Sequence, residues 1–136
     1  MFPALDISSS ALAAQRIRMD AIAGNMANAF TTTQEDGRVD PYKRRVVMFA
    51  SGDGAGGPGV HVQQVTTDPA PPRMVFDPGR PDAQKEGPWA GYVAYPNVSL
   101  TTEYVDAMSA ARAYELNLAM LNLSKGMIQQ AVQLLA

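Results

Sequence analysis

The sequence predicts an α+β fold in which two long terminal helices pack as a coiled-coil-like pair around an inserted, mostly antiparallel β unit. Apolar residues at alternating spacings of three and four mark both chain ends. Nine of the eleven glycines and nine of the ten prolines lie between residues 30 and 98. We therefore expect an N-terminal axial helix over 1–30, a β-rich segment over 31–99 and a C-terminal axial helix over 100–136.

The N-terminal helix is predicted from a heptad repeat. One of the three serines at 8–10 is expected to cap it, and Asn28 is expected to end it through a left-handed turn. Its apolar seam consists of Leu5, Leu12, Met19 and Met26, with Ile22 beside it.

The middle of the chain is too rich in glycine and proline for long helices. Short runs of β-branched and aromatic residues predict four strands, at 42–49, 60–66, 73–76 and 92–95. A glycine-rich link, 52–59, joins the first two. We expect this unit to leave the two chain ends side by side.

The C-terminal helix, 101–135, contains no proline and carries two apolar stripes. Because two residues turn a helix by about 200°, the stripes are predicted to lie almost opposite each other. The five large residues of the second stripe are worth about 8–15 kcal/mol when buried. The first stripe is Tyr104, Ala107, Ala111, Tyr114, Leu118, Leu121, Ile128, Val132 and Leu135, and the second is Ala113, Leu116, Met120, Leu123, Met127 and Leu134.

The two helices also differ in length. At 1.5 Å per residue they would span about 32 and 52 Å, so pairing leaves about 20 Å of the longer one uncovered. A helical hairpin within a monomer covers one stripe only. An assembly of many copies covers both, and we favour it.

Composition excludes several classes of function. Eleven basic and thirteen acidic residues argue against general nucleic-acid binding. The absence of cysteine excludes disulfides, thiolate metal sites and thiol catalysis. No cleavable secretory signal is predicted at the N-terminus, and the amides of the C-terminal helix argue against a membrane span.

No catalytic, cofactor-binding or metal-binding residues are nominated. The segment 52–59 lacks the Lys-Ser/Thr of a phosphate loop and is interpreted as a flexible link. His61 is interpreted as an exposed strand residue. Glu103 and Asp106 are explained by the helix N-terminal dipole, and the basic cluster 43–45 by an exposed strand face or an inter-subunit contact.

Two stretches carry a resemblance to a known family. Residues 23–31, with the step Asn25-Met26-Ala27-Asn28, resemble the N-terminal signature of bacterial flagellar rod and hook axial proteins. Residues 77–83 and 91–98, followed by Glu103, Met108, Arg112, Tyr114 and Asn117, resemble the proximal rod proteins of that family. The similarity covers nearly the whole chain.

The resemblance implies a structural, non-enzymatic subunit of the flagellar basal body, exported through the type III apparatus to the periplasm without a cleaved signal. It implies assembly with copies of itself and with other proximal rod proteins. Further implied neighbours are the rod-base adapter, the distal rod, the surrounding ring and the export gate. The terminal helices would build a hollow shaft that transmits torque and lines the export channel.

We expect the assembly interface to consist of apolar helix residues, two asparagines at the helix exit, an arginine that pairs with a neighbour's acid, and a glycine that permits close approach. The alternative is a soluble helical adaptor or chaperone that binds one partner helix. The expected interface is Leu12, Met19, Ile22, Asn25, Met26, Asn28, Arg112, Tyr114, Leu116, Leu118, Met120, Leu121, Leu123, Gly126, Met127 and Ile128.

Overall fold

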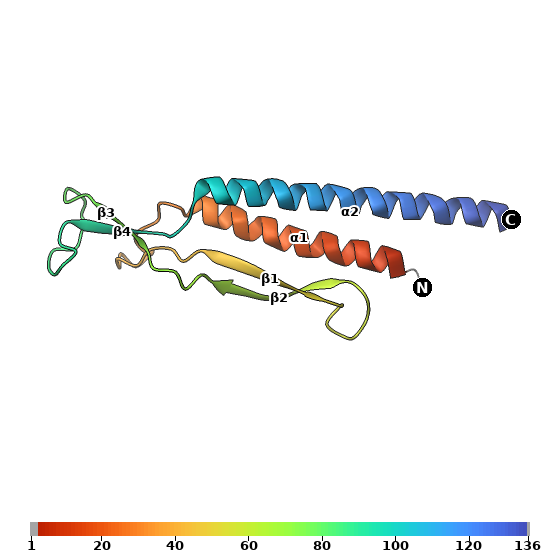
Figure 1. The fold of residues 1–136 in the computed structure, drawn as a ribbon, viewed down its shortest axis with the longest axis horizontal. Helices are drawn as coiled ribbons and strands as arrows, with labels where there is room; N and C mark the ends of the chain where they lie inside the picture. Colours follow the sequence, from red (N-terminus) through yellow and green to blue (C-terminus); the bar gives the residue numbers. More distant parts are fainter. Residues whose placement is uncertain (1–2, 136) are drawn as a thin grey trace.

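The computed structural model describes residues 3–135 and confirms the α+β fold. Two helices, α1 (Pro3–Ala27) and α2 (Leu100–Leu135), enclose four strands in the sequence. Figure 1 shows α1 between α2 and the hairpin formed by β1 (Arg45–Ser51) and β2 (Val60–Thr67). A second hairpin, β3 (Arg73–Phe76) and β4 (Tyr92–Tyr95), lies at the end of the molecule far from both termini.

The two helices run antiparallel, because the chain leaves α1 and enters α2 at the same end (Figure 1). Their 25 and 36 residues correspond to about 37 and 54 Å. The last part of α2 therefore extends beyond the start of α1, as predicted. The region where α1 ends, β1 begins and α2 begins is called the junction below.

The strands are antiparallel, as predicted, but they form two separate two-stranded sheets rather than one unit. Three of the predicted strands lie within one residue of their observed bounds. The predicted start of the first strand at 42 is wrong, because β1 begins at Arg45. The Tyr42 amide donates to the carbonyl of Thr31 at 3.0 Å and so does not join the ladder.

The caps predicted for α1 are also wrong. The serines at 8–10 lie inside the helix, where the hydroxyls of Ser9 and Ser10 donate to carbonyls three residues earlier. No residue other than glycine has a positive φ among residues 3–135, so Asn28 makes no left-handed turn. Its side-chain amide instead donates to the carbonyl of Gly24 at 2.9 Å and ends the helix that way.

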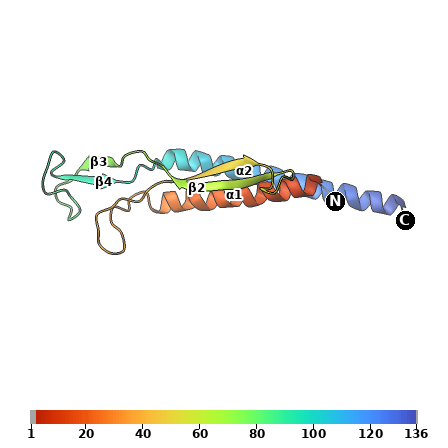
Figure 2. The same ribbon diagram turned by 90° about the horizontal axis from the view of Figure 1, so that it is seen from below.

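The β1–β2 hairpin is fastened to α1 at both of its ends. Near the turn, the amide of Val60 donates to the hydroxyl of Ser10 at 3.2 Å. A Cβ on Gly59, whose φ is +128°, would meet that hydroxyl at 2.6 Å, so only glycine fits there. Near the junction, the side chain of Asn25 bonds the backbone of Arg45. Figure 2 shows the hairpin lying along the helices between these points.

The core is small. Among the described residues, five of the eight buried apolar residues are alanines, which bring backbones close together but bury little surface. Much of the larger apolar surface therefore stays outside. The buried apolar residues are Ala14, Ala21, Ile22, Ala29, Val93, Ala94, Val98 and Ala110.

Candidate assembly interface

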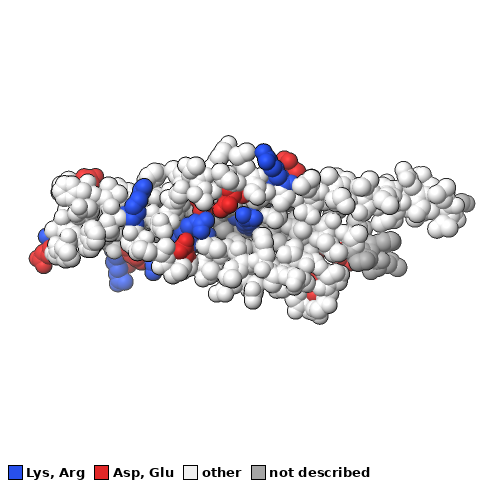
Figure 3. Space-filling view, viewed as in Figure 1, with Lys and Arg blue, Asp and Glu red and all other residues white. Residues whose placement is uncertain are grey.

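The outer stripe is a row of four large apolar side chains, from the middle of α2 onward, that no other described part of the chain covers. Leu116, Met120, Leu123 and Met127 are 68, 54, 59 and 63% exposed. Their spacings of four, three and four residues place them on one face of the helix. Leu134, further along, is exposed as well. Figure 3 shows that the far end of α2 is almost free of charged side chains.

The total surface agrees with this description. The accessible surface is 9290 Å², whereas a compact monomer of 14.5 kDa exposes about 6,900 Å². The excess of about 2,400 Å² is of the size that permanent protein interfaces bury. The isolated chain thus exposes more surface than a compact monomer of its mass, as expected of a subunit that is covered by others.

The covered side of α2 coincides only in part with the predicted first stripe. The contact with the rest of the chain follows buried Glu103 and Ala110 and half-buried Asn117, Ser124 and Ile128. These residues are mostly small or polar, so hydrophobicity alone did not mark them. Five residues of the predicted stripe are half-buried as well, namely Ala107, Ala111, Tyr114, Leu121 and Ile128. The other four, Tyr104, Leu118, Val132 and Leu135, are exposed.

The predicted interface residues divide into two groups. The first faces other parts of the same chain and is buried or half-buried: Leu12, Met19, Ile22, Asn25, Met26, Asn28, Tyr114, Leu121 and Ile128. The second is exposed and consists of Arg112, Leu118 and the four residues of the outer stripe. Gly126 is half-buried, yet a Cβ there would have no neighbour within 4 Å.

Asn25 joins three elements at the junction. Its amide donates to the carbonyl of Arg45 at 2.9 Å and to the carboxylate of Glu103 at 3.1 Å. Its side-chain oxygen accepts from the Arg45 amide at 2.8 Å and from the Tyr42 hydroxyl at 3.1 Å. Asn25 is 1% exposed, and both its donors and both its acceptor positions are used. Only an amide at this position can make all four bonds.

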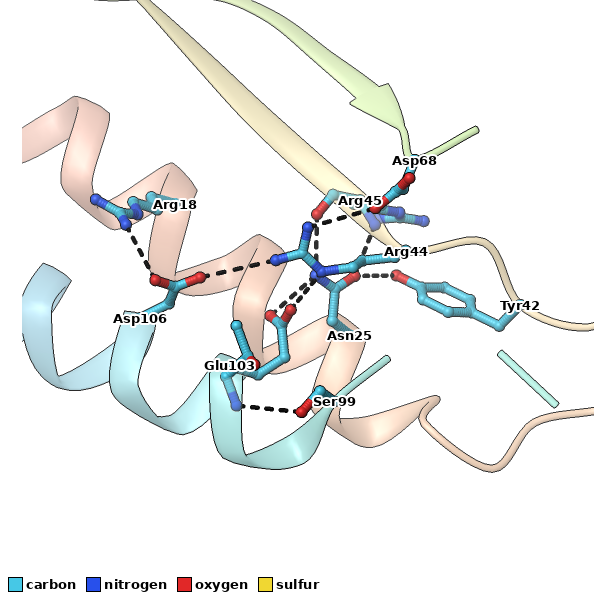
Figure 4. A network of polar contacts seen from close by, with 10 residues as sticks. Arg18, Asn25, Tyr42, Arg44, Arg45, Asp68, Ser99, Glu103 and Asp106 are labelled. Atoms are coloured by element: carbon cyan, nitrogen blue, oxygen red, sulfur yellow. Dashed lines mark hydrogen bonds and ion pairs between the residues drawn. The ribbon is translucent and has the colours of Figure 1, made fainter. Parts of the chain in front are cut away.

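Glu103 is completely buried at the start of α2. Its other carboxylate oxygen accepts from Arg44 Nε at 2.6 Å, while Arg44 also lies 3.7 Å from each of Asp68 and Asp106. Figure 4 shows these side chains converging from α1, β1, the end of β2 and α2. Because an unpaired buried carboxylate is costly, this network holds the hairpin and the two helices in one arrangement.

Sequence reasoning missed the central part of this network. The helix-dipole interpretation of Glu103 does not account for its contacts with Arg44 and Asn25. The predicted basic cluster at 43–45 is not uniformly exposed, since Arg44 turns inward. Arg18, which lies 3.6 Å from Asp106, was not singled out either. The sequence does not show which side chain of such a basic cluster points into the protein and which points to solvent.

A second polar cluster lies at the base of the β3–β4 hairpin. Arg80 donates to the Tyr95 hydroxyl at 2.7 Å and to Asp82 at 3.0 Å, and Thr32 donates to the same carboxylate at 2.7 Å. The bond to Tyr95 raises the pKa of the Arg80 guanidinium above its ordinary value. The cluster fastens the hairpin to the segment that follows α1.

His61 and the glycine-rich loop at 52–59, which were considered as possible sites of catalysis or ligand binding, make contacts within the β1–β2 hairpin. His61 lies in β2 and is half-buried, with its Nδ1 2.8 Å from the Gly52 carbonyl. In the loop before it, Asp53 accepts from the amides of Ala55 and Gly57, which lower the pKa of its carboxyl group. Among residues 3–135 no cluster of three His, Asp or Glu side chains could hold a metal ion. Neither described helix combines the length and apolarity needed to cross a membrane.

Comparison with known proteins gives consistent matches at both ends and over the whole chain. The family model described as "Flagella basal body rod protein" matches residues 5–33, and the one described as "Flagellar basal body rod FlgEFG protein C-terminal" matches residues 90–134.

Among curated relatives, the flagellar basal-body rod protein FlgC of Borreliella burgdorferi is 37% identical, covering 99% of this chain and 97% of its own length. FlgC of Bacillus subtilis is 39% identical over 98 and 97% of the two chains, and FlgC of Yersinia enterocolitica is 43% identical over 95 and 93%. These matches exceed what a shared helix pattern alone would give. The chain belongs to the FlgC family of flagellar basal-body rod proteins.

Proposed function

We propose that the chain is a structural, non-enzymatic subunit of the proximal rod of the flagellar basal body. Residues 1–30 and 100–136 would form the axial part, and residues 31–99 would be displayed outside it. In this role the helices assemble into a hollow shaft that transmits torque and lines the export channel. Membership of the FlgC family and the uncovered outer stripe of α2 support the proposal.

The outer stripe carries most of the argument. Four large apolar side chains that are more than half exposed cost solubility, and burying each is worth about 1.5–3 kcal/mol. A partner must supply the cover. A rod supplies it through copies of this chain and through other rod proteins, including the rod-base adapter and the distal rod. The ring and the export gate would lie next to the finished shaft.

The same proposal implies where in the cell the protein is located. The subunit would cross the inner membrane through the type III apparatus without a cleaved signal and fold in the periplasm. The junction network suits such a route, because its contacts join residues 25, 44 and 103 and form only after residue 103 has been exported.

Complementation tests the proposal. The chain is supplied to a bacterium that lacks its own FlgC, and swimming and the protein content of isolated basal bodies are measured. We expect swimming cells whose basal bodies contain the chain. A chain that is expressed and secreted yet found only as a soluble complex of fixed stoichiometry with one partner would contradict the proposal and favour an adaptor.

A further inference from the structure

Two pairs of exposed charges lie on the outer faces of the helices. α1 carries Arg16 and Asp20, and α2 carries Arg112 and Glu115. All four are exposed, and within residues 3–135 none of them forms an ion pair. In each pair the basic residue precedes the acidic one, the less favourable order for pairing along one helix. Their charges are therefore available to another molecule.

On α2, Arg112 continues the outer stripe, and Glu115 lies beside that face, three residues further on. Arg112 lies four residues before Leu116, so the two side chains share a face of the helix. The face of α1 that carries Arg16 and Asp20 is different in character. It also exposes Ser9 and Ala13, whose small side chains allow another helix to approach closely.

The order of the charges along the molecule is complementary. α2 runs away from the junction, so Arg112 comes before Glu115 in that direction. α1 runs towards the junction, so Asp20 comes before Arg16 in the same direction. The members of the pairs are about 4.5 and 6 Å apart along their helices. When α2 of one copy lies beside α1 of another copy in the same orientation, acid meets base at both positions.

The ion pair between Arg18 and Asp106 gives the register within one chain. Measured along the axis from the level of this ion pair, Asp20 lies about 3 Å nearer to the junction and Arg16 about 3 Å further from it. On α2, Arg112 and Glu115 lie about 9 and 13.5 Å further from the junction than the ion pair. A single shift of the second copy by about 11 Å along the axis therefore aligns both pairs.

The same shift covers the outer stripe. Moved by about 11 Å, α1 of the second copy reaches along α2 to about the level of Met127. Ser9 of that copy then lies opposite Leu123, within about 1 Å along the axis. The register set by the charges thus also covers the apolar stripe.

We propose that α2 of each copy docks on α1 of a second copy through the outer stripe, in a register fixed by Arg112 with Asp20 and Glu115 with Arg16. This inference rests on the proposed rod function and specifies its contact between like subunits. The two surfaces differ and the shift does not close, so repetition produces an ascending helical row rather than a dimer.

Cross-linking tests the register. Because the chain contains no cysteine, the two introduced thiols would be the only thiols in its copies. One copy carries Ser9→Cys and a second carries Leu123→Cys, both expressed in the bacterium that encodes this chain. The matched control replaces Leu123→Cys by Leu116→Cys, also on the outer stripe but about 10 Å from Ser9 along the axis. A disulfide requires Cα atoms within about 7 Å.

We expect swimming cells whose basal bodies yield the cross-linked dimer with the cysteine at 123 and not with the cysteine at 116. Equal cross-linking from both positions, or from neither, in swimming cells would overturn the register and leave the rod function standing. Failure of the wild-type chain to enter basal bodies would instead refute the proposed function.

Charge reversal gives a second test that needs no cysteine. Arg112→Glu and Asp20→Arg should each reduce incorporation into basal bodies roughly tenfold, and combining them should restore it. The control exchanges Arg112→Glu and Glu115→Arg, which keeps the net charge but should not restore incorporation. Normal incorporation of either single variant, or a combined variant no better than the single ones, would overturn the proposal.

Discussion

Near its start α2 buries a carboxylate among hydrogen bonds and ion pairs, whereas near its end it exposes leucine and methionine to solvent. Glu103 is inaccessible, while Leu123, twenty positions later, is 59% exposed. On α2 the buried carboxylate lies where the chain supplies its partners, and the exposed leucines and methionines lie where the chain supplies no cover. The difference teaches that the junction is completed by the chain itself and that the far end of α2 requires another molecule.

The largest effect is expected at the far end. Leu123→Asp places a charge in the centre of the outer stripe and should abolish incorporation into basal bodies. Since Leu123 is already exposed, the free energy of unfolding of the isolated chain should change by less than about 0.5 kcal/mol. Gln129→Asp makes the same charge change at an exposed position off the stripe and should leave incorporation intact. Incorporation of L123D at the wild-type level would remove the stripe from the interface.

The next effect is expected at the junction and should have the opposite character. Arg44→Met leaves Glu103 buried without its cation, which should lower the free energy of unfolding by about 3–5 kcal/mol. Denaturant unfolding of the purified chain measures it. Adding Glu103→Leu removes the buried charge and should recover most of the loss. A double variant as unstable as the single one would show that the pair matters for another reason.

Substitutions of Gly126 test whether another backbone approaches the far end of α2 closely. Because a Cβ there meets nothing within 4 Å, Gly126→Ala should stabilise the isolated chain by about 1 kcal/mol. Gly126→Val should leave expression intact but block incorporation, if a neighbouring backbone approaches at this point. Circular dichroism gives the first result and swimming gives the second. Normal swimming by G126V would show that no close approach occurs.

The smallest of these effects is expected at Asp106, the more exposed of two acidic residues at the junction. Asp106 contacts Arg18 and Arg44 as Glu103 contacts Arg44, but over a third of its side chain is exposed and its distances are 3.6 and 3.7 Å. Solvent weakens such pairs, so Asp106→Asn should cost less than about 1 kcal/mol. Urea unfolding of this variant beside R44M provides the comparison. Equal losses would mean that burial does not decide the strength of these contacts.

The sequence was informative wherever a pattern repeats. The periodic apolar residues and the position of glycine and proline predicted both helices and all four strands, because these patterns act locally. The excess of apolar residues on α2 was visible for the same reason. The residue step from Asn25 to Asn28 indicated the broad axial family, and residues 77–83 and 91–98 indicated its proximal rod proteins. Neither stretch indicated the contacts that Asn25 makes.

The junction could not be predicted from the sequence. Asn25, Arg44 and Glu103 lie far apart in the chain, and none belongs to a periodic pattern. The observed helix contact was predicted only in part, because Ala110, Asn117 and Ser124, which also lie along it, are small or polar. Close packing of backbones is favoured by small side chains, which a search for hydrophobic residues passes over.

Hydrogen exchange of the isolated, dilute chain tests the central claim most directly, with sedimentation to show that the chain is monomeric. Amides in residues 116–135 should exchange much faster than those in residues 100–115, and should become protected in isolated basal bodies. If residues 116–135 were as protected as residues 100–115 in the monomer, the chain would already cover its own α2, and assembly would not be needed to explain the exposed stripe.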